Sequence, residues 1–129
     1  MLFQDRFAAH AGVTLEHVEP GRARARLVIG PQHLNGVGIV QGGAIFTLAD
    51  FAFAAASNSS GSVAVAIDVS ISFLKAVTGG VLVAEAFEEA AAGRIGTSLI
   101  RVKDSEGGLV AIFKGTAFRR RDSEAAPAS

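Results

Sequence analysis

The most prominent feature of the chain is an apolar, helix-forming run flanked on both sides by segments in which apolar and polar residues alternate. From about Gly43 to Ser57 the run is rich in alanine and phenylalanine, contains no proline and places apolar residues on almost every side of a helix. At ~1.5 Å per residue, ~14 residues make a rod of ~21 Å, about the width of a small sheet. The pattern therefore predicts a long helix that protein surrounds on all sides.

The alternating segments predict strands of an antiparallel sheet. Two precede the helix and four follow it, at residues 13–18, 21–29, 63–74, 81–90, 95–103 and 109–118. In the second segment the small and aliphatic residues point one way, while Arg22, Arg24 and Arg26 point the other way. An arginine row of this kind is typical of a solvated sheet face, with an acidic partner surface or a phosphate-bearing ligand as the alternative.

The segment 63–74 alternates most regularly, which predicts one apolar face and one small or polar face. The apolar face would carry Val63, Val65, Ile67, Val69, Ile71 and Phe73. Asp68 falls on the opposite face, where an ion pair or an exposed surface position is expected.

This order of elements predicts an α+β fold in which a curved antiparallel sheet of five or six strands wraps around the central helix. A short helix is expected at residues 3–11. We expect one domain, residues 1–118, followed by a disordered tail at residues 119–129. Because one chain offers few layers to cover so apolar a helix, we also expect a partner chain.

Composition narrows the classes of protein that this pattern can represent. Half of the 129 residues are hydrophobic, which suits one domain with one core. A net charge of zero gives no basis for generic nucleic-acid binding, and the absence of cysteine excludes disulfides, thiolate zinc sites and a cysteine nucleophile. The N-terminus does not resemble a signal peptide, and the apolar run is too short to span a bilayer. We expect a cytoplasmic protein that binds neither nucleic acid nor a membrane.

Gly42 and Gly43 stand at the start of the predicted helix, where the first N–H groups have no partner inside the helix. These groups act together as a partial positive charge, and glycine lets another molecule approach the backbone closely. The pair can therefore hold an anion, or a carbonyl oxygen that becomes one. A simple tight turn is the alternative.

Asp50 is the only acid in the helical run, and it lies on a thin polar stripe with Thr47, Ala54 and Ser57. A buried carboxylate is costly unless donors hold it. Two interpretations follow: Asp50 is held by backbone donors or an arginine, or it faces a cleft where it attacks a substrate or activates water. Phe46, Phe51 and Phe53 of the same run are expected in the core.

One string of residues resembles a known family. His33-Leu34-Asn35, Gly38, Gln41-Gly42-Gly43 and Leu48-Ala49-Asp50, at this spacing, resemble the acyl-CoA thioesterases of the hotdog fold, in particular the branch of the phenylacetic-acid-pathway (PaaI) enzymes. The resemblance covers roughly residues 3–118. It implies dimers whose sheets join edge to edge and often pair into tetramers. It also implies active sites at the dimer interface, with the glycine loop from one chain and the acid from the other.

The resemblance assigns roles to individual residues. The N–H of Gly42 would hold the oxyanion, Asp50 would be nucleophile or general base, and the Asn35 amide would position the reacting groups. Gln41 stands where most of the branch has histidine, and it could orient the thioester carbonyl. The substrate-binding positions that we expect are Gly43, His33, Thr47, Lys75 and Arg94, the last two for coenzyme A phosphates.

Two departures from the family pattern keep alternatives open. The hydroxyl that commonly places water is missing at both matching positions, Ala66 and Ala54, although Thr47 or Ser57 could compensate. The substrate that we expect is an aryl- or medium-chain acyl-CoA, with no cofactor and no metal, because no second ligand lies near His33 at metal-binding spacing. The alternatives are a hotdog dehydratase or hydratase that pairs His33 with Asp50, and an acyl-CoA-binding protein without turnover.

Overall fold

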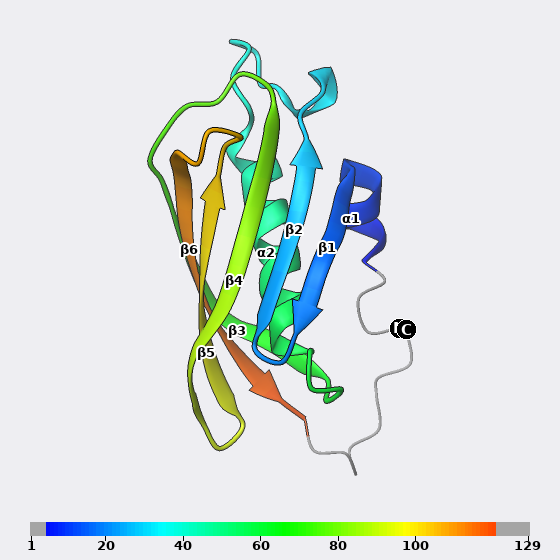
Figure 1. Ribbon diagram of the computed structural model, residues 1–129, viewed down its shortest axis with the longest axis vertical. Coiled ribbons are helices and arrows are strands. Elements are labelled where there is room, and N and C mark those ends of the chain that lie inside the picture. The colour runs from blue at the N-terminus through cyan, green and yellow to red at the C-terminus, as the bar shows by residue number, and fades with distance from the viewer. Residues whose placement is uncertain (1–4, 121–129) are drawn as a thin grey trace.

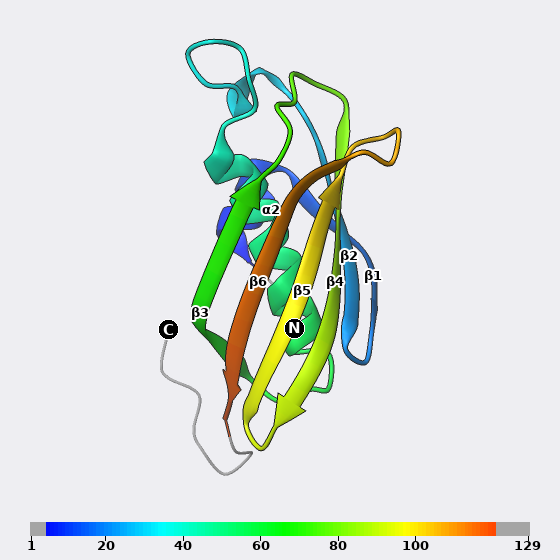
Figure 2. The same cartoon turned by 90° about the vertical axis from the view of Figure 1, so that its left-hand side faces the viewer.

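The computed structural model describes residues 5–120 as a curved six-stranded antiparallel sheet wrapped around one long helix (Figures 1 and 2). Its elements are α1 (Arg6–Ala11), β1 (Val13–Glu19), β2 (Arg22–Val28), the 3₁₀ helix η1 (Pro31–His33), α2 (Gly42–Ser57), β3 (Ala64–Phe73), β4 (Val81–Ala92), β5 (Ile95–Lys103) and β6 (Leu109–Arg119). The strand order is β1-β2-β4-β5-β6-β3, so β1 and β3 are the two edges. The predicted α+β architecture and its central helix are confirmed.

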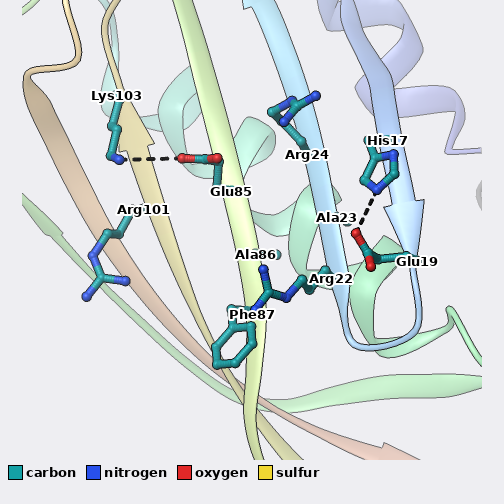
Figure 3. Close-up of a pocket in the computed structure, with 10 residues that line it drawn as sticks. All are labelled: His17, Glu19, Arg22, Ala23, Arg24, Glu85, Ala86, Phe87, Arg101 and Lys103. Carbon is teal, nitrogen blue, oxygen red and sulfur yellow. Dashed lines mark hydrogen bonds and ion pairs between the residues drawn. The ribbon is translucent and has the colours of Figure 1, made fainter.

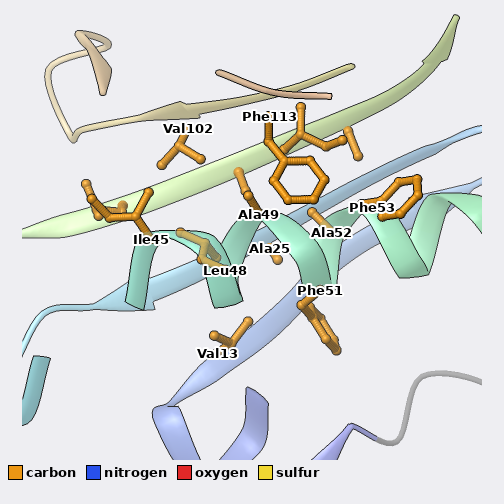
Figure 4. Packing of buried hydrophobic residues seen from close by; sticks show 14 of the residues in the cluster. Val13, Ala25, Ile45, Leu48, Ala49, Phe51, Ala52, Phe53, Val102 and Phe113 are labelled. Atoms are coloured by element: carbon orange, nitrogen blue, oxygen red, sulfur yellow. The ribbon is translucent and has the colours of Figure 1, made fainter. Parts of the chain in front are cut away.

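The concave face of the sheet is lined by small residues where it meets α2. Ala23, Ala25, Ala84 and Ala86 are all buried there. At Gly115 an added Cβ would lie 2.7 Å from the Phe53 ring, so the ring occupies the space of the missing side chain. Small residues therefore let the helix lie close to the strands, and the aromatic rings fill the remaining space (Figure 4).

The predicted aromatic core of α2 is confirmed for Phe51 and Phe53, which are buried, while Phe46 is only partly buried. Phe46 packs edge-on against Phe113 with ring centroids 5.3 Å apart. The expected polar stripe is only partly correct, because Ser57 is buried rather than exposed beside Asp50. Its hydroxyl has no hydrogen-bond partner among residues 5–120.

Asn58 ends α2 and fixes the beginning of β3. Its side-chain amide donates to the carbonyl of Ala54 at 2.8 Å, and its side-chain carbonyl accepts the N–H of Ala64 at 2.8 Å. The residue is buried, so these bonds are shielded from water. One side chain thereby joins the helix end to the edge strand.

The prediction of one continuous apolar face on β3 is wrong, because the strand contains a register shift between Ala66 and Asp68. Such an irregularity inserts an extra residue and reverses the facing of the residues before it. Ala66 pairs with the buried Ala117, whereas Val65 pairs with Phe118 on the other side of the sheet. Val69, Ile71 and Phe73 keep the predicted inward side, and Asp68 keeps its exposed outer position.

The described residues end shortly after β6 and begin just before α1. β6 continues to Arg119, and the predicted tail beyond residue 120 lies outside the described residues, as do the first residues of the predicted helix at 3–11. Within residues 5–120 no helix has the length and apolar content needed to cross a lipid bilayer.

Candidate functional site

The loop between β2 and α2 is held in place by His33. The histidine is buried; its Nδ1 accepts the N–H of Gly30 at 2.9 Å and its Nε2 lies 2.6 Å from the carbonyl oxygen of Ala11. Because Nδ1 accepts a hydrogen bond, the proton of the neutral ring belongs on Nε2, where it is donated to Ala11. Both ring nitrogens are therefore engaged within the chain.

Asn35 shapes the tip of this loop. Its side-chain carbonyl accepts the N–H groups of Val37 and Ile39 at 3.0 and 3.1 Å. The side chain is exposed, and within residues 5–120 no hydrogen bond uses its NH₂ group. The amide can therefore build the loop with its oxygen and still donate to a ligand with its nitrogen.

The backbone N–H groups of the first two residues of α2, Gly42 and Gly43, differ in their hydrogen bonding. Gln41 caps the helix, and its side-chain oxygen accepts the N–H of Gly43 at 3.1 Å. The N–H of Gly42 has no hydrogen-bond acceptor among the described residues. A side chain at Gly43 would displace the Gln41 cap, because an added Cβ would lie 2.5 Å from Oε1. The capping geometry therefore singles out Gly42 as the free donor, at the positive end of the helix.

A cavity of ≈390 Å³ adjoins Gly42. Its walls are mainly apolar and come from the loop before α2, the first turn of α2 and the chain after β3: Ile39, Val40, Gly42, Ile45, Phe73, Leu74, Lys75, Ala76 and Val77. An apolar cavity with a few aimed polar groups is the usual form of a small-molecule site. The free amide and the cavity together can receive a carbonyl oxygen attached to an apolar group.

Asp50 is a half-buried carboxylate that accepts no hydrogen bond from any residue the structure describes. Burial raises the pKa of Asp50, and the negative charge of Asp5 raises it further. Asp5 precedes α1 and accepts the N–H of Ala8 at 2.9 Å as the cap of that helix. The interpretation that donors hold Asp50 is therefore not supported, and the carboxylate keeps its acceptor capacity for a substrate or water.

A pH-rate measurement can test the influence of Asp5 on Asp50. In Asp5→Asn the cap is retained, since asparagine caps helices about as well as aspartate, but the charge is lost. We expect the pKa of Asp50 to fall, so the acidic limb of the pH-rate profile of any reaction that requires ionised Asp50 should move to lower pH. Glu16→Gln removes an equal charge from an ion pair with Arg24 on the sheet surface, and it should leave the limb in place. Identical limbs in Asp5→Asn and the native protein would contradict this coupling.

Gly42 and Asp50 do not meet within one chain. They lie eight residues apart on the same helix, which at ~1.5 Å per residue separates them by ~12 Å along its axis. A reacting carbonyl has to lie within hydrogen-bond distance of the donor and within reach of the carboxylate or its water. The free amide and the carboxylate of one chain are therefore too far apart to act on the same carbonyl.

The remaining predicted binding residues lie in different places. The Thr47 hydroxyl donates to the carbonyl of Gly43 at 2.8 Å, and Lys75 lines the cavity while its ammonium group pairs with Asp104 at 2.5 Å. Arg94 lies in the β4–β5 turn, which is at the opposite end of the sheet from the start of α2 (Figure 2), and its guanidinium lies 5.4 Å from the centre of the Phe118 ring. Lys75 and Arg94 cannot contact one ligand within a single chain.

A second cavity, of ≈320 Å³, lies on the outer sheet face and contains part of the arginine row (Figure 3). Arg22 lies 4.6 Å from the centre of the Phe87 ring, Arg24 pairs with Glu16 at 3.5 Å, and Lys103 pairs with Glu85 at 3.5 Å. The expected solvated sheet face accounts for these contacts. The sheet separates this cavity from α2, so it holds neither the free amide nor Asp50.

Comparison with known proteins decides the class of the molecule. The family model described as the Thioesterase superfamily matches residues 37–111, which include both glycines and Asp50. The chain belongs to this superfamily. It is 33% identical to the acyl-coenzyme A thioesterase PaaI of Escherichia coli over 92% of this chain and 86% of that protein. It is a hotdog-fold thioesterase of the PaaI type and a thioester hydrolase.

Solved structures agree with this assignment. The structure of the Escherichia coli PaaI protein from the phenylacetic acid degradation operon superimposes with a TM-score of 0.87, over the same shares of the two chains. The TT0310 protein of Thermus thermophilus superimposes with a TM-score of 0.86 at 36% identity, covering 91% of this chain and 99% of that one. The predicted hotdog fold and the predicted relationship to PaaI are confirmed.

Proposed function

We propose that this thioesterase hydrolyses an aryl- or medium-chain acyl-CoA to the free acid and coenzyme A. The observation that carries the proposal is the free N–H of Gly42 beside an apolar cavity. An apolar wall suits an acyl group, and a free amide at a helix start suits the negative charge that develops on a thioester carbonyl oxygen. The name of the Escherichia coli relative supports the coenzyme A half of the substrate.

In the proposed reaction the thioester carbonyl oxygen accepts the N–H of Gly42. Asp50 either attacks the carbonyl carbon or takes a proton from a water molecule that attacks it. The C–S bond breaks, the thiolate of coenzyme A leaves and takes up a proton, and water supplies the oxygen of the free acid. Within residues 5–120 no hydrogen bond uses the NH₂ group of Asn35 or that of Gln41, so we assign both groups to positioning the thioester.

The two halves of the site come together in a homodimer of the proposed enzyme. β3 is a sheet edge, and Val65, Ile67 and Phe73 on it are half exposed. An exposed apolar edge strand is a template for pairing with another strand. A two-fold axis that pairs β3 with its copy presents the same surface of each chain to the other. Such a dimer would place Asp50 of one protomer opposite Gly42 of its partner.

Hydration or dehydration at carbon, the alternative that pairs His33 with Asp50, has less support. Both nitrogens of His33 are already bonded within the chain, to Gly30 and Ala11, and the ring is buried. Proton transfer by this histidine would require the loop before α2 to open.

The experiment that tests the function is a thiol-release assay with acetyl-, hexanoyl-, decanoyl- and phenylacetyl-CoA. We expect free thiol and free acid from at least the phenylacetyl or medium-chain ester. No thiol from any ester, with each substrate recovered unchanged, would contradict hydrolysis of acyl-CoA. A product that keeps the thioester and has a shifted double bond or an added hydroxyl, with crotonyl-CoA as substrate, would instead favour the hydratase.

Subunit complementation tests whether the site is shared between protomers. Asp50→Asn removes the acid, and Gly42→Pro removes the amide donor, so each homodimer should be nearly inactive. In co-expressed protein, half of randomly formed dimers are mixed, and each mixed dimer has one intact site of two, which predicts about a quarter of the native rate. A mixture no more active than either variant alone would show that the acid and the amide act within one chain.

A further inference from the structure

We propose that Phe73 determines which acyl groups this enzyme accepts, by closing one side of the space in front of the Gly42 amide. This inference rests on the proposed function, since it takes the free N–H of Gly42 to be the place where the thioester carbonyl binds.

The Phe73 ring points end-on at Gly42. A Cβ built at Gly42 would lie 3.0 Å from Cζ of the ring and 3.4 Å from both Cε1 and Cε2. Outside the two chain neighbours of Gly42 and the adjoining backbone of α2, the tip of the ring is therefore the described atom nearest to this Cβ position. A group that leaves a carbonyl carbon at the Gly42 amide on this side of Gly42 meets the ring, so we infer that the ring limits the width of such a group.

The backbone beneath the ring is fixed on both sides. Phe73 pairs with Ala111 in the β3–β6 ladder, and the next residue, Leu74, donates its N–H to the carbonyl of Val110 at 2.8 Å. On the far side of the cavity, Val40 donates its N–H to the carbonyl of Val77 at 2.8 Å. The backbone from Phe73 to Val77 is thus hydrogen-bonded to the sheet and to the loop before α2, and it cannot move away without breaking these bonds.

The ring itself contributes little to the core. Phe73 is 52% exposed, whereas Phe53 and Phe113 of the packed interior are 2% and 0% exposed. Truncation of a half-exposed side chain leaves little buried cavity within its own chain and so costs the single protomer little stability. Phe73 therefore has the properties expected of a selectivity residue: a fixed base, a ring that borders the ligand space, and a small role in folding.

The test is a comparison of acyl groups in Phe73→Ala and Phe73→Leu. We expect kcat/KM for phenylacetyl-CoA relative to acetyl-CoA to rise by about tenfold in the alanine variant and by less in the leucine variant, as more of the wall is removed. Phe87→Ala removes an equal ring from the outer sheet face and should leave the ratio unchanged. Equal changes for both esters, or no change, would overturn the proposal.

A second variant pair tests the contact itself. Gly42→Ala keeps the N–H but pushes a methyl group against the Phe73 ring, so it should lower activity, and the double variant with Phe73→Ala should recover it. A double variant no more active than Gly42→Ala would overturn the contact. Binding of ketone analogues of the two esters, in which CH₂ replaces the thioester sulfur and the carbonyl is kept, supplies a readout by calorimetry that needs no hydrolysis. If native protein releases no thiol but the binding preference still follows residue 73, the proposed function fails while this inference stands.

Discussion

Replacing Asp50 by asparagine is expected to reduce kcat for thioester hydrolysis by about 10²- to 10⁴-fold, the usual contribution of a positioned acid or base. Asparagine has almost the same shape but can neither accept a proton from water nor form an acyl intermediate. The loss should appear in kcat, because the proposed role of Asp50 is at the reacting carbon and not in binding the coenzyme A part of the substrate. Thiol release by purified native and variant protein, at saturating substrate, measures the effect.

The stability of Asp50→Asn shows whether a loss of activity comes from lost catalysis or from unfolding. Burial and Asp5 raise the pKa of Asp50, so in the window above the ordinary carboxyl pKa the folded chain keeps a proton that the unfolded chain releases. Stability therefore falls as pH rises through this window and stays lower above it. Asparagine has no such dependence, and Asp50→Asn should melt at the same or a higher temperature at neutral pH. A variant that is fully active, or one that is inactive only because it unfolds, would contradict the role of Asp50.

Replacing Gly42 by proline is expected to lower kcat by about 10²- to 10³-fold, because it deletes the backbone N–H that we propose as the oxyanion donor. The position suits this unusual change. Gly42 is the first residue of α2, where proline is well tolerated, and Gln41 has the extended conformation that proline requires before it, with φ −66° and ψ 138°. The substitution therefore removes one N–H that makes no bond within the described chain, without altering the helix.

Gly42→Ala is the matched control for this experiment, because it adds the same Cβ and keeps the N–H. Activity lost through contact with Phe73 should return when Phe73→Ala is added to Gly42→Ala, and should not return when it is added to Gly42→Pro. Similar activity in the proline and alanine variants, with or without Phe73, would exclude the Gly42 amide as the oxyanion donor. Circular dichroism and thermal melting of both variants would check that α2 is intact.

The sequence was sufficient for the architecture because α2 has almost no polar side. A helix of that composition has to be covered, and the six alternating segments around it supply one sheet that can do so. The glycine pair and Asp50 were also visible, since a lone acid in an apolar run and two glycines at a helix start are local features. Their separation along the helix follows from counting residues.

Other parts of the site depend on tertiary geometry and left no clear local pattern. The register shift in β3 adds one residue to a strand without changing its composition, so the reversal of Val65 could not be read from alternation. The effect of Asp5 on Asp50 arises only when α1 packs on α2. Phe73 resembles any inward residue of a strand until its ring is found against Gly42, and Asp104 resembles any turn residue until it pairs with Lys75.

The alanine-lined concave face restricts how relatives of this enzyme can broaden their substrate range. The helix already lies close to the strands, so a cavity opened between them would remove core packing contacts and destabilise the fold. Space for a longer or broader acyl group costs less stability when it is made in the cavity beside the first turn of α2, or at the interface with a neighbouring subunit. Substitutions that change the acyl preference of relatives should therefore lie in residues 34–41 and 73–77, while the positions of the central alanines should keep small residues.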